Sequence, residues 1–388
     1  MSVQIVTLGC RLNLAESEEM ARLAQGEEDL VIVNSCAVTA EAVRRTRQAI
    51  RGARRERPEA RIVVTGCAAQ IDPAGFAGMP EVTRVISNFA KLGRAPFAPP
   101  VSSSDRTRAF VGVQTGCDHR CTFCIIPFGR GPSRSVPAGA VVERIAALVG
   151  GGVREVVLTG VDLTSYGHDL PGAPPLGSLV ERILRHIPSL PRLRLSSIDS
   201  VEIDARLFEL IASEARVMPH LHLSLQAGDD MVLKRMKRRH SRADAVRIVE
   251  RIKARRDVAI GADLIAGFPT ESEEMAANSL RLIADCQIVY GHIFRFSPRE
   301  GTPAARMPQV PHAALKERAA ALREAAAAQR SRWLRSLVGT RQRVLVERCG
   351  SQGHAENFAT VRVQHPSQDV VDVEIAEAGD STLTGVAA

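Results

Sequence analysis

The sequence predicts an α/β protein in three parts: an N-terminal three-layer-like α/β domain, a central partial (β/α)6 barrel and a small C-terminal β-barrel. Strand-like runs alternate with helical stretches through most of the chain, which is typical of parallel sheets. A stretch rich in Pro and Ser interrupts this alternation. Near the end, a long Ala- and Arg-rich helix is followed only by strand-like runs. These features place the domains at residues 1–95, 109–338 and 339–388, with a linker at 96–108.

The composition suits a cytoplasmic protein with a polyanionic partner. The 388 residues exceed one ordinary core, and 45% of them are hydrophobic while 24% are charged. The formal charge of +8 favours nucleic acid, because Lys and Arg release counterions at phosphates, although a coding bias toward Arg would give the same charge. Residues 1–10 lack a signal-peptide pattern, and no segment has the apolar length of a membrane span. We therefore expect no membrane partner.

The N-terminal part has strand-like runs that are each followed by a cysteine. The runs are 3–8, 30–33 and 61–65, and helices follow the first two from near Asn13 and Thr39. Because the carboxyl ends of parallel strands lie side by side, we expect the three thiols to converge on one site. They belong to Cys10, Cys36 and Cys67. The alternative is three unrelated thiols, because Cys is commonly buried.

The central part has strand-like runs separated by helical stretches, which predicts a parallel sheet curled into a partial barrel. The runs are 109–114, 155–158, 193–196, 220–225, 259–265 and 290–296. Chemistry is expected on loops at the carboxyl ends of such strands, and a cysteine-rich loop at 117–124 follows the first run.

The C-terminal part begins after a long helix that starts near His312 and ends before Gly339. Runs of β type follow near Val344, Thr360 and Val370, which predicts a small β-barrel. Two cysteines outside the clustered ones have no comparable partners, so we assign Cys286 to a core helix and Cys349 to a tail strand.

The loop at 117–124 has CxxxCxxC spacing, which places the thiolates of Cys117, Cys121 and Cys124 close together. Clustered cysteines in a reducing compartment indicate metal binding or catalysis rather than disulfides. A structural zinc needs a fourth ligand, which His119 or His168 could supply. A 4Fe-4S cluster needs no fourth protein ligand if a substrate occupies the last iron.

The loop resembles the motif of radical S-adenosylmethionine (SAM) enzymes, because an aromatic residue, Phe123, precedes its last cysteine. The residues after it, Ile125-Ile126-Pro127-Phe128-Gly129-Arg130-Gly131, resemble the methylthiotransferase family. Further segments resemble the N-terminal domain and the barrel of that family, so that the likeness spans nearly the whole chain. These segments are 7–13, 34–39, 65–68, 222–228, 267–271 and 296–303.

The resemblance implies two 4Fe-4S clusters with separate tasks. The cluster on Cys117, Cys121 and Cys124 would bind SAM and release a 5'-deoxyadenosyl radical. The cluster on Cys10, Cys36 and Cys67 would present the transferred sulfur, and a second SAM would supply the methyl group. Carbon 2 of adenine has neither an acidic proton nor a leaving group, so radical chemistry suits that position. We predict no catalytic residue beyond the cluster ligands.

Small and polar residues at strand ends are candidate SAM contacts, together with Phe123. Thr159 and Gly160 follow the second central run, where radical SAM proteins usually have a Gly-rich contact to the SAM amino group. Ser196, Ser197 and Gln226 follow later runs. These last three residues are each equally well explained as ordinary polar residues of a loop or strand end.

The segments 8–13 and 113–117 resemble most the MtaB branch, which acts on N6-threonylcarbamoyladenosine at position 37, in the anticodon stem-loop of tRNA. Other branches act on isopentenyladenosine in tRNA (MiaB) or on an aspartate of a ribosomal protein (RimO). The segment 344–386 resembles the TRAM module, a small RNA-binding β-barrel. An electron donor and a sulfur source are the remaining expected partners. A different class of function is a metal-stabilised RNA-binding protein without catalysis.

Overall fold

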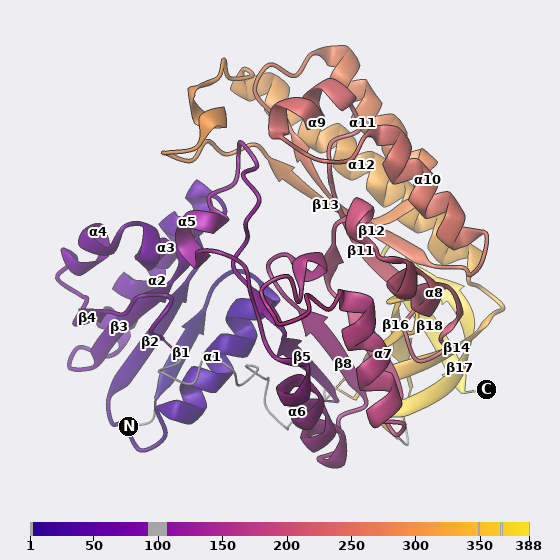
Figure 1. Ribbon diagram of the computed structural model, residues 1–388, viewed down its shortest axis with the longest axis horizontal. Coiled ribbons are helices and arrows are strands. Elements are labelled where there is room, and N and C mark those ends of the chain that lie inside the picture. The colour runs from indigo at the N-terminus through magenta and orange to yellow at the C-terminus, as the bar shows by residue number, and fades with distance from the viewer. Residues whose placement is uncertain (1–2, 92–106, 348–349, 365, 367, 388) are drawn as a thin grey trace.

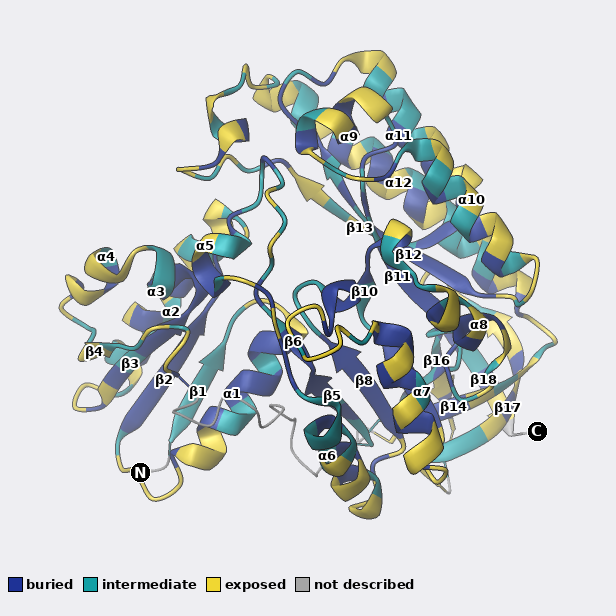
Figure 2. Ribbon diagram, viewed as in Figure 1, coloured by how far each residue is buried: buried dark blue, intermediate teal, exposed yellow. Residues whose placement is uncertain are grey.

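A computed structural model of the chain describes residues 3–91, 107–347, 350–364, 366 and 368–387. Most of the predicted linker at 96–108, and Cys349, lie outside the described residues. Figure 1 shows an N-terminal sheet on one side, a curved central sheet wrapped by helices, and a β-barrel at the C-terminal end. Figure 2 shows that buried residues follow the strands and the inner sides of the helices. Among the described helices, none is long and apolar enough to cross a membrane.

The N-terminal part is a parallel sheet in the order β1-β2-β3-β4 with helices on both faces. Met20 of α1 packs with Ile32 on one face, whereas Ile50 of α2 and Phe76 of α4 pack with Ile62 on the other. The three-layer prediction is therefore confirmed. β4 was not predicted because it is only a two-residue strand. The elements are β1 Gln4–Thr7, α1 Arg11–Leu23, β2 Leu30–Ser35, α2 Ala40–Glu56, β3 Arg61–Gly66, α3 Cys67–Ile71, α4 Pro73–Ala77 and β4 Arg84–Val85.

The central part is the predicted partial barrel, made of the parallel sheets β5-β8-β9 and β10-β11-β12-β13. Ser196 interrupts one strand between β9 and β10, and its N–H donates to the Leu158 carbonyl at 3.0 Å. The strands are β5 Arg108–Gly112, β8 Glu155–Thr159, β9 Arg192–Leu195, β10 Ser197–Ile198, β11 His220–Gln226, β12 Ala259–Ala266 and β13 Ile288–Arg295. The helices are α6 Ala138–Gly150, α7 Leu176–His186, α8 Ala205–Ser213, α9 Asp230–Met236, α10 Arg242–Lys253, α11 Glu273–Asp285 and α12 His312–Ser336.

Alternation along these strands separates an apolar outer face from a polar inner face. Leu221, Leu223 and Leu225 of β11 belong to the large core under the helices. Successive side chains of a strand point to opposite faces, so His222 and its inner neighbours face the interior of the barrel. The run predicted at 109–114 is divided, because Gln114 belongs to β6 (Gln114–Thr115), which pairs with β7 (Arg134–Ser135).

The C-terminal part is a closed barrel in the strand order β14-β15-β16-β18-β17, as predicted. Gly339, with φ of 78°, follows α12 in the left-handed conformation that favours glycine. The strands are β14 Arg341–Val346, β15 Gln352–Ala355, β16 Thr360–Val363, β17 Val370–Ala378 and β18 Leu383–Ala387. β15 and β18 were not predicted, because the sequence QGHA of β15 lacks β-branched residues and a glycine interrupts the sequence LTGVA of β18.

A buried ionic cluster joins this small barrel to the amino-terminal ends of the central strands. Glu155, the first residue of β8, is fully buried and accepts hydrogen bonds from Arg108 at 2.6 Å and from Arg194 at 3.0 Å. Arg194 also donates to the carbonyl of Glu356 and lies 4.8 Å from the ring of Phe358. Burial opposes ionisation of Glu155, but the guanidinium groups outweigh it and hold its pKa far below the usual value. The C-terminal barrel thus closes the floor of the central barrel.

We expect Glu155→Gln to lower the free energy of unfolding by about 3–5 kcal/mol at neutral pH, because it leaves buried guanidinium groups without an anion. Glu181→Gln is the matched control, because its pair with Arg206 is 49% and 43% exposed and should contribute below about 1 kcal/mol. Urea denaturation of both variants measures the difference.

The buried carboxylate of Glu155 should also make the free energy of unfolding depend on pH. The pKa of Glu155 in the folded state lies below the unfolded value of about 4.3. Its stabilisation of the folded state is therefore complete above about pH 4.3 and is lost as the pH falls through the folded pKa. Equal urea midpoints for Glu155→Gln and the wild type at neutral pH would contradict the assignment.

Candidate functional site

The cysteine loop lies between β6 and α5 (Ile126–Arg130), at the carboxyl end of the first central strand. Backbone bonds fix its shape: the N–H of Cys117 donates to the Gly131 carbonyl and that of Cys124 to the Cys121 carbonyl, both at 3.1 Å. Gly116 must be glycine, because its φ is 76° and a Cβ there would stand 1.9 Å from the Pro132 carbonyl oxygen. The loop therefore presents its thiols as one group.

Burial makes the thiols of Cys117 and Cys124 poor anions unless a cation lies beside them. It raises the pKa of Cys124 to about 11, and it raises that of Cys117 further with the help of the Asp162 charge. Arg238 donates to Cys121 Sγ at 3.7 Å and to Asp199 at 2.7 Å. Bound iron stabilises thiolates directly, so the donor set fits a 4Fe-4S cluster.

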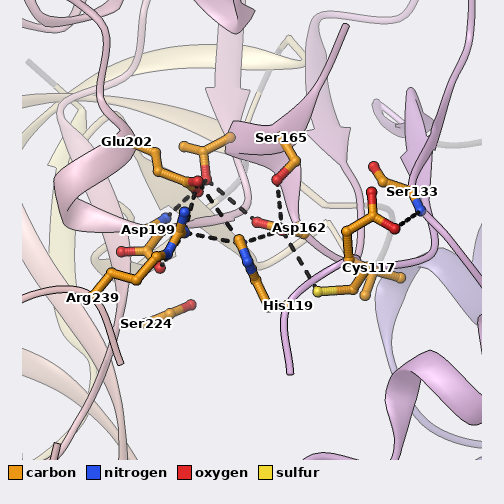
Figure 3. A network of polar contacts seen from close by, with 12 residues as sticks. Cys117, His119, Ser133, Asp162, Ser165, Asp199, Glu202, Ser224 and Arg239 are labelled. Carbon is orange, nitrogen blue, oxygen red and sulfur yellow. Dashed lines mark hydrogen bonds and ion pairs between the residues drawn. The ribbon is translucent and has the colours of Figure 1, made fainter. Parts of the chain in front are cut away.

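His119 belongs to a polar network beside the loop (Figure 3). Its Nε2 lies 2.8 Å from Asp162 Oδ2, which also accepts from Ser165 at 2.7 Å. Hydrogen bonds to Asp162 and Glu202 raise the pKa of His119 to about 10. Protonated Nε2 donates to Asp162 and cannot accept from Arg239 Nη2, 2.9 Å away, so Glu202 at 2.6 Å is the partner that holds Arg239.

The zinc alternative fits this geometry less well. Ligand atoms of Cys117, His119 and Asp162 lie within 4.8 Å of one another, so they could hold a metal ion. That donor set would use only one of the clustered thiols. His168 is exposed and lies after the turn at Ser165. The CxxxCxxC loop as a whole is explained better by an iron–sulfur cluster.

The structure brings the N-terminal cysteines together at the carboxyl edge of β1, β2 and β3. A Cβ on Gly9 would stand 3.0 Å from Cys36 Sγ, which places the Cys10 turn against Cys36. Burial, reinforced by the charges of Cys67 and Cys10, raises the pKa of the Cys36 thiol. Cys36 and Cys67 are buried whereas Cys10 is exposed, so the group opens on one side. Its role as a cluster site stays a prediction.

Side-chain hydrogen bonds hold these turns in place. Asn13 donates to the carbonyls of Leu8 at 2.7 Å and Ser35 at 3.1 Å. Ser35 Oγ accepts from the N–H groups of Ala68 and Ala69, both at 3.1 Å, at the start of the helix that carries Cys67. The turns after β1, β2 and β3 are therefore fixed to one another.

A buried ion pair connects the two cysteine groups. Arg130, at the end of α5, pairs with Glu16 of α1 at 2.9 and 3.0 Å and also hydrogen-bonds Asn13. Lys91 pairs with the same carboxylate at 2.5 Å. Burial opposes ionisation of Glu16, but these cations outweigh it and hold its pKa at about 2. The short helix α5 that follows Cys124 is thus fixed to α1, the helix that follows Cys10.

The candidate SAM contacts lie around the carboxyl ends of the central strands. Thr159 is buried at the end of β8, and Gly160 lies against Gln114, whose Oε1 accepts from the N–H groups of Val161 and Asp162. Gln226 ends β11 with φ of 66°, an uncommon conformation for a residue other than glycine. Ser196 and Ser197 lie at the β9–β10 break, and Phe123 packs edge-on against Phe268 at 6.5 Å.

Several residues that shape this site were not predicted to do so from the sequence. Gln114 fastens the loop after β8 to the cysteine loop, donating to the Gly116 carbonyl at 2.9 Å. Asp199 and Arg238 come from segments far apart in the chain. Asp162 lies two residues after the candidate contact Gly160, but its contact with His119 has no sequence signal. Cys286 is buried in the large core as expected, one residue beyond α11.

Residues 111–283 match the radical SAM superfamily, and residues 2–87 match an uncharacterized protein family, UPF0004. The chain is 47% identical over 383 residues to threonylcarbamoyladenosine tRNA methylthiotransferase MtaB of Rickettsia prowazekii, covering 93% of this chain and 91% of that protein. It is 34% identical to the protein of the same name from Thermotoga maritima, covering 94% and 91%.

Among solved structures, the radical SAM methyltransferase TsrM of Kitasatospora setae has a TM-score of 0.51 at 15% identity, covering 74% of this chain and 68% of that chain. OxsB, a cobalamin-dependent radical SAM enzyme, has a TM-score of 0.50 at 9% identity, covering 84% and 56%. At these identities the likeness shows the fold alone, and that fold is the radical SAM fold.

We expect Gly66→Ala to lower the bound iron by about half, because Gly66 has φ of 93° and a Cβ there would stand 2.4 Å from the Ser35 carbonyl oxygen, next to Cys67. Gly26→Ala is the matched control: its φ of 92° imposes the same backbone strain, but nothing lies within 4 Å of the added Cβ. Iron and sulfide assays after anaerobic reconstitution measure the effect. Equal iron in the two variants would contradict a cluster at Cys67.

Proposed function

The chain belongs to the MtaB family of radical SAM tRNA methylthiotransferases, and we propose that it inserts a methylthio group at carbon 2 of N6-threonylcarbamoyladenosine at position 37 of tRNA. The observation that carries this proposal is the pair of cysteine groups joined through Arg130 and Glu16, in a chain similar to MtaB over nearly its full length. The enzyme uses SAM and 4Fe-4S clusters, as the family does.

The cysteines form two sets, and each set would hold one cluster. Cys117, Cys121 and Cys124 would hold the cluster that binds SAM, and Cys10, Cys36 and Cys67 would hold the second cluster. When bound, these clusters supply the electron for reductive SAM cleavage and the sulfur for transfer. Asp162 and Gln114 join the loop of the first site to the loop after β8, and Arg238 donates to Cys121.

Other parts of the proposal concern partners and domains. The candidate SAM contacts are Phe123, Thr159, Gly160, Ser196, Ser197 and Gln226, which lie at or near the carboxyl ends of central strands. We assign cluster and sulfur delivery to residues 1–95, radical chemistry to 109–338 and RNA binding to the TRAM-like barrel at 339–388. The enzyme would act in the cytoplasm, where tRNA is found, and would need an electron donor and a sulfur source.

A strain without this gene should lose 2-methylthio-N6-threonylcarbamoyladenosine and keep the nucleoside that lacks the methylthio group. Mass spectrometry of nucleosides from digested tRNA measures both, and a plasmid copy of the gene should restore the product. Loss of the isopentenyl derivative instead would move the assignment to the MiaB substrate. Unchanged tRNA with an unmodified ribosomal aspartate would move it to the RimO substrate.

Alanine substitutions should give two phenotypes. Loss of a thiol at the SAM site should abolish reductive SAM cleavage, because no iron would remain to bind the cofactor, so no 5'-deoxyadenosine forms. Loss of a thiol at the second site should leave that cleavage but abolish methylthiolation, because no sulfur is presented. The first set is Cys117, Cys121 and Cys124, and the second is Cys10, Cys36 and Cys67.

Both products are measured in parallel on folded, anaerobically reconstituted protein, with Cys286→Ala as the control because this buried thiol lies in the large core. Each cluster variant should retain about half of the iron of the wild type. A folded Cys36→Ala variant that still methylthiolates tRNA would show that the second site is assigned wrongly.

A further inference from the structure

Three polar side chains that the proposed chemistry has not used lie together inside the central barrel. They are His222 on β11, Asp263 on β12 and His292 on β13, three neighbouring strands. The strand register pairs His222 with Gly261 and Asp263 with His292. Leu223, Ala262 and Leu264, which alternate with them, belong to the outer core, so this cluster faces the barrel interior.

The cluster is held in a defined geometry. Asp263 Oδ1 lies 3.0 Å from His222 Nε2 and 3.3 Å from His292 Nδ1, and the imidazole rings are 4.4 Å apart. Burial opposes ionisation of Asp263, but the two histidines outweigh it and hold its pKa at about 2. A Cβ on Gly261 would stand 2.5 Å from His222 Nδ1, so glycine there makes room for the ring.

The cluster is exposed to solvent on the side of His292. The exposed fraction of the side chain is 9% for His222, 22% for Asp263 and 62% for His292. The bond to Asp263 uses Nδ1 of His292, so Nε2 at the opposite edge of the ring stays available. A charged acceptor, Asp263, and a ring nitrogen of His292 thus lie side by side where the cluster meets solvent.

The cluster lies one layer away from the proposed radical site. Ser224, the next inner residue of β11, accepts through its carbonyl from Arg238 at 2.9 Å, and Arg238 also donates to Cys121. Two residues of a strand span about 7 Å, so His222 lies about that far along β11 from the layer tied to the cysteine loop. On the other side, His220 contacts Phe358 of the floor, with 4.9 Å between the rings.

We propose that His222, Asp263 and His292 bind the threonylcarbamoyl group of the substrate base. His292 Nε2 hydrogen-bonds its carboxylate or hydroxyl, Asp263 accepts from its urea N–H or hydroxyl, and His222 holds Asp263 in place. This inference rests on the proposed function. The substituent begins on the same six-membered ring as carbon 2, so a base with carbon 2 at the radical site carries this group within one layer of the cluster. The polar cluster suits the threonylcarbamoyl group, which contains N–H and hydroxyl donors as well as a carboxylate.

The same cluster disfavours an isopentenyl group. That substituent is apolar, so it would remove water from the carboxylate and the imidazoles without replacing their hydrogen bonds. Sites built to hydrogen-bond a substrate strongly reject analogues that lack the bonding groups. The cluster therefore favours the threonylcarbamoyl substrate over the isopentenyl one within the same chemistry.

The test uses the reconstituted full-length enzyme and two anticodon stem-loop RNAs, one with N6-threonylcarbamoyladenosine at position 37 and one with adenosine there. The Kd is measured for both RNAs, and kcat/KM for the modified one. His292→Asn and Asp263→Asn should weaken binding of the modified RNA about 10- to 100-fold, with little change for the unmodified RNA. His292 is largely exposed, so its substitution should not affect folding.

Two further variants separate recognition from a structural role. Gly261→Ala should give the same loss of preference, because the added Cβ displaces the His222 ring. His186→Asn is the control, since this exposed histidine of α7 bonds only the Arg182 carbonyl among the described residues. Reductive SAM cleavage without RNA should stay within about twofold of the wild type in the His292 and Gly261 variants.

The outcomes distinguish the inference from the proposed function. A wild type that does not methylthiolate the modified RNA contradicts the proposed function. An active wild type whose preference for modified RNA persists in His292→Asn and Asp263→Asn overturns the inference. One equivalent of tightly held zinc in the wild type, lost in His292→Asn, would show a metal site and would also overturn direct recognition.

Discussion

The buried pairing of Arg130 with Glu16 is the constraint on which the arrangement of the two cysteine groups depends. Each residue lies just beyond one group, Arg130 after Cys124 and Glu16 after Cys10. Removing two charges from water is costly, and only a close partner with further hydrogen bonds offsets that cost. Asn13, Thr115 and Lys91 supply those bonds. Any displacement of the N-terminal sheet from the cysteine loop would leave a buried charge unpaired. The ion pair therefore fixes the position of one cysteine group relative to the other.

The hydrophobic periodicity of the sequence predicted most of the strands and helices. Parallel strands buried on both faces read as short apolar runs, and β2 and β8 are buried along their whole length. The convergence of Cys10, Cys36 and Cys67 followed from the rule that such strands end at one edge. Among the strands that were missed, β4, β6 and β7 have two residues each, β15 lacks β-branched residues, and a glycine interrupts β18.

The polar surroundings of the site were less predictable, for a physical reason. Cysteines can be recognised from spacing because three ligands on one loop must follow one another closely. A hydrogen bond such as Arg238 to Asp199, or His292 to Asp263, needs only that two strands or loops meet in space. His222 lay in a segment that resembled the family, yet its partner on β12 and Gly261, which admits its ring, could be found only from the strand register.

The floor of the central barrel brings all three parts of the chain together. Phe358 adopts φ of 72°, a conformation that costs a residue with a side chain roughly 1–2 kcal/mol, and its ring lies 4.8 Å from the Arg194 guanidinium and 5.6 Å from that of Arg11. Arg194 also pairs with Glu155, and Arg11 directly follows Cys10. The turn between β15 and β16 is therefore packed against the same helix that presents the N-terminal cysteine. The position of the small barrel and that of the second cysteine group are coupled through two contacts of one aromatic ring.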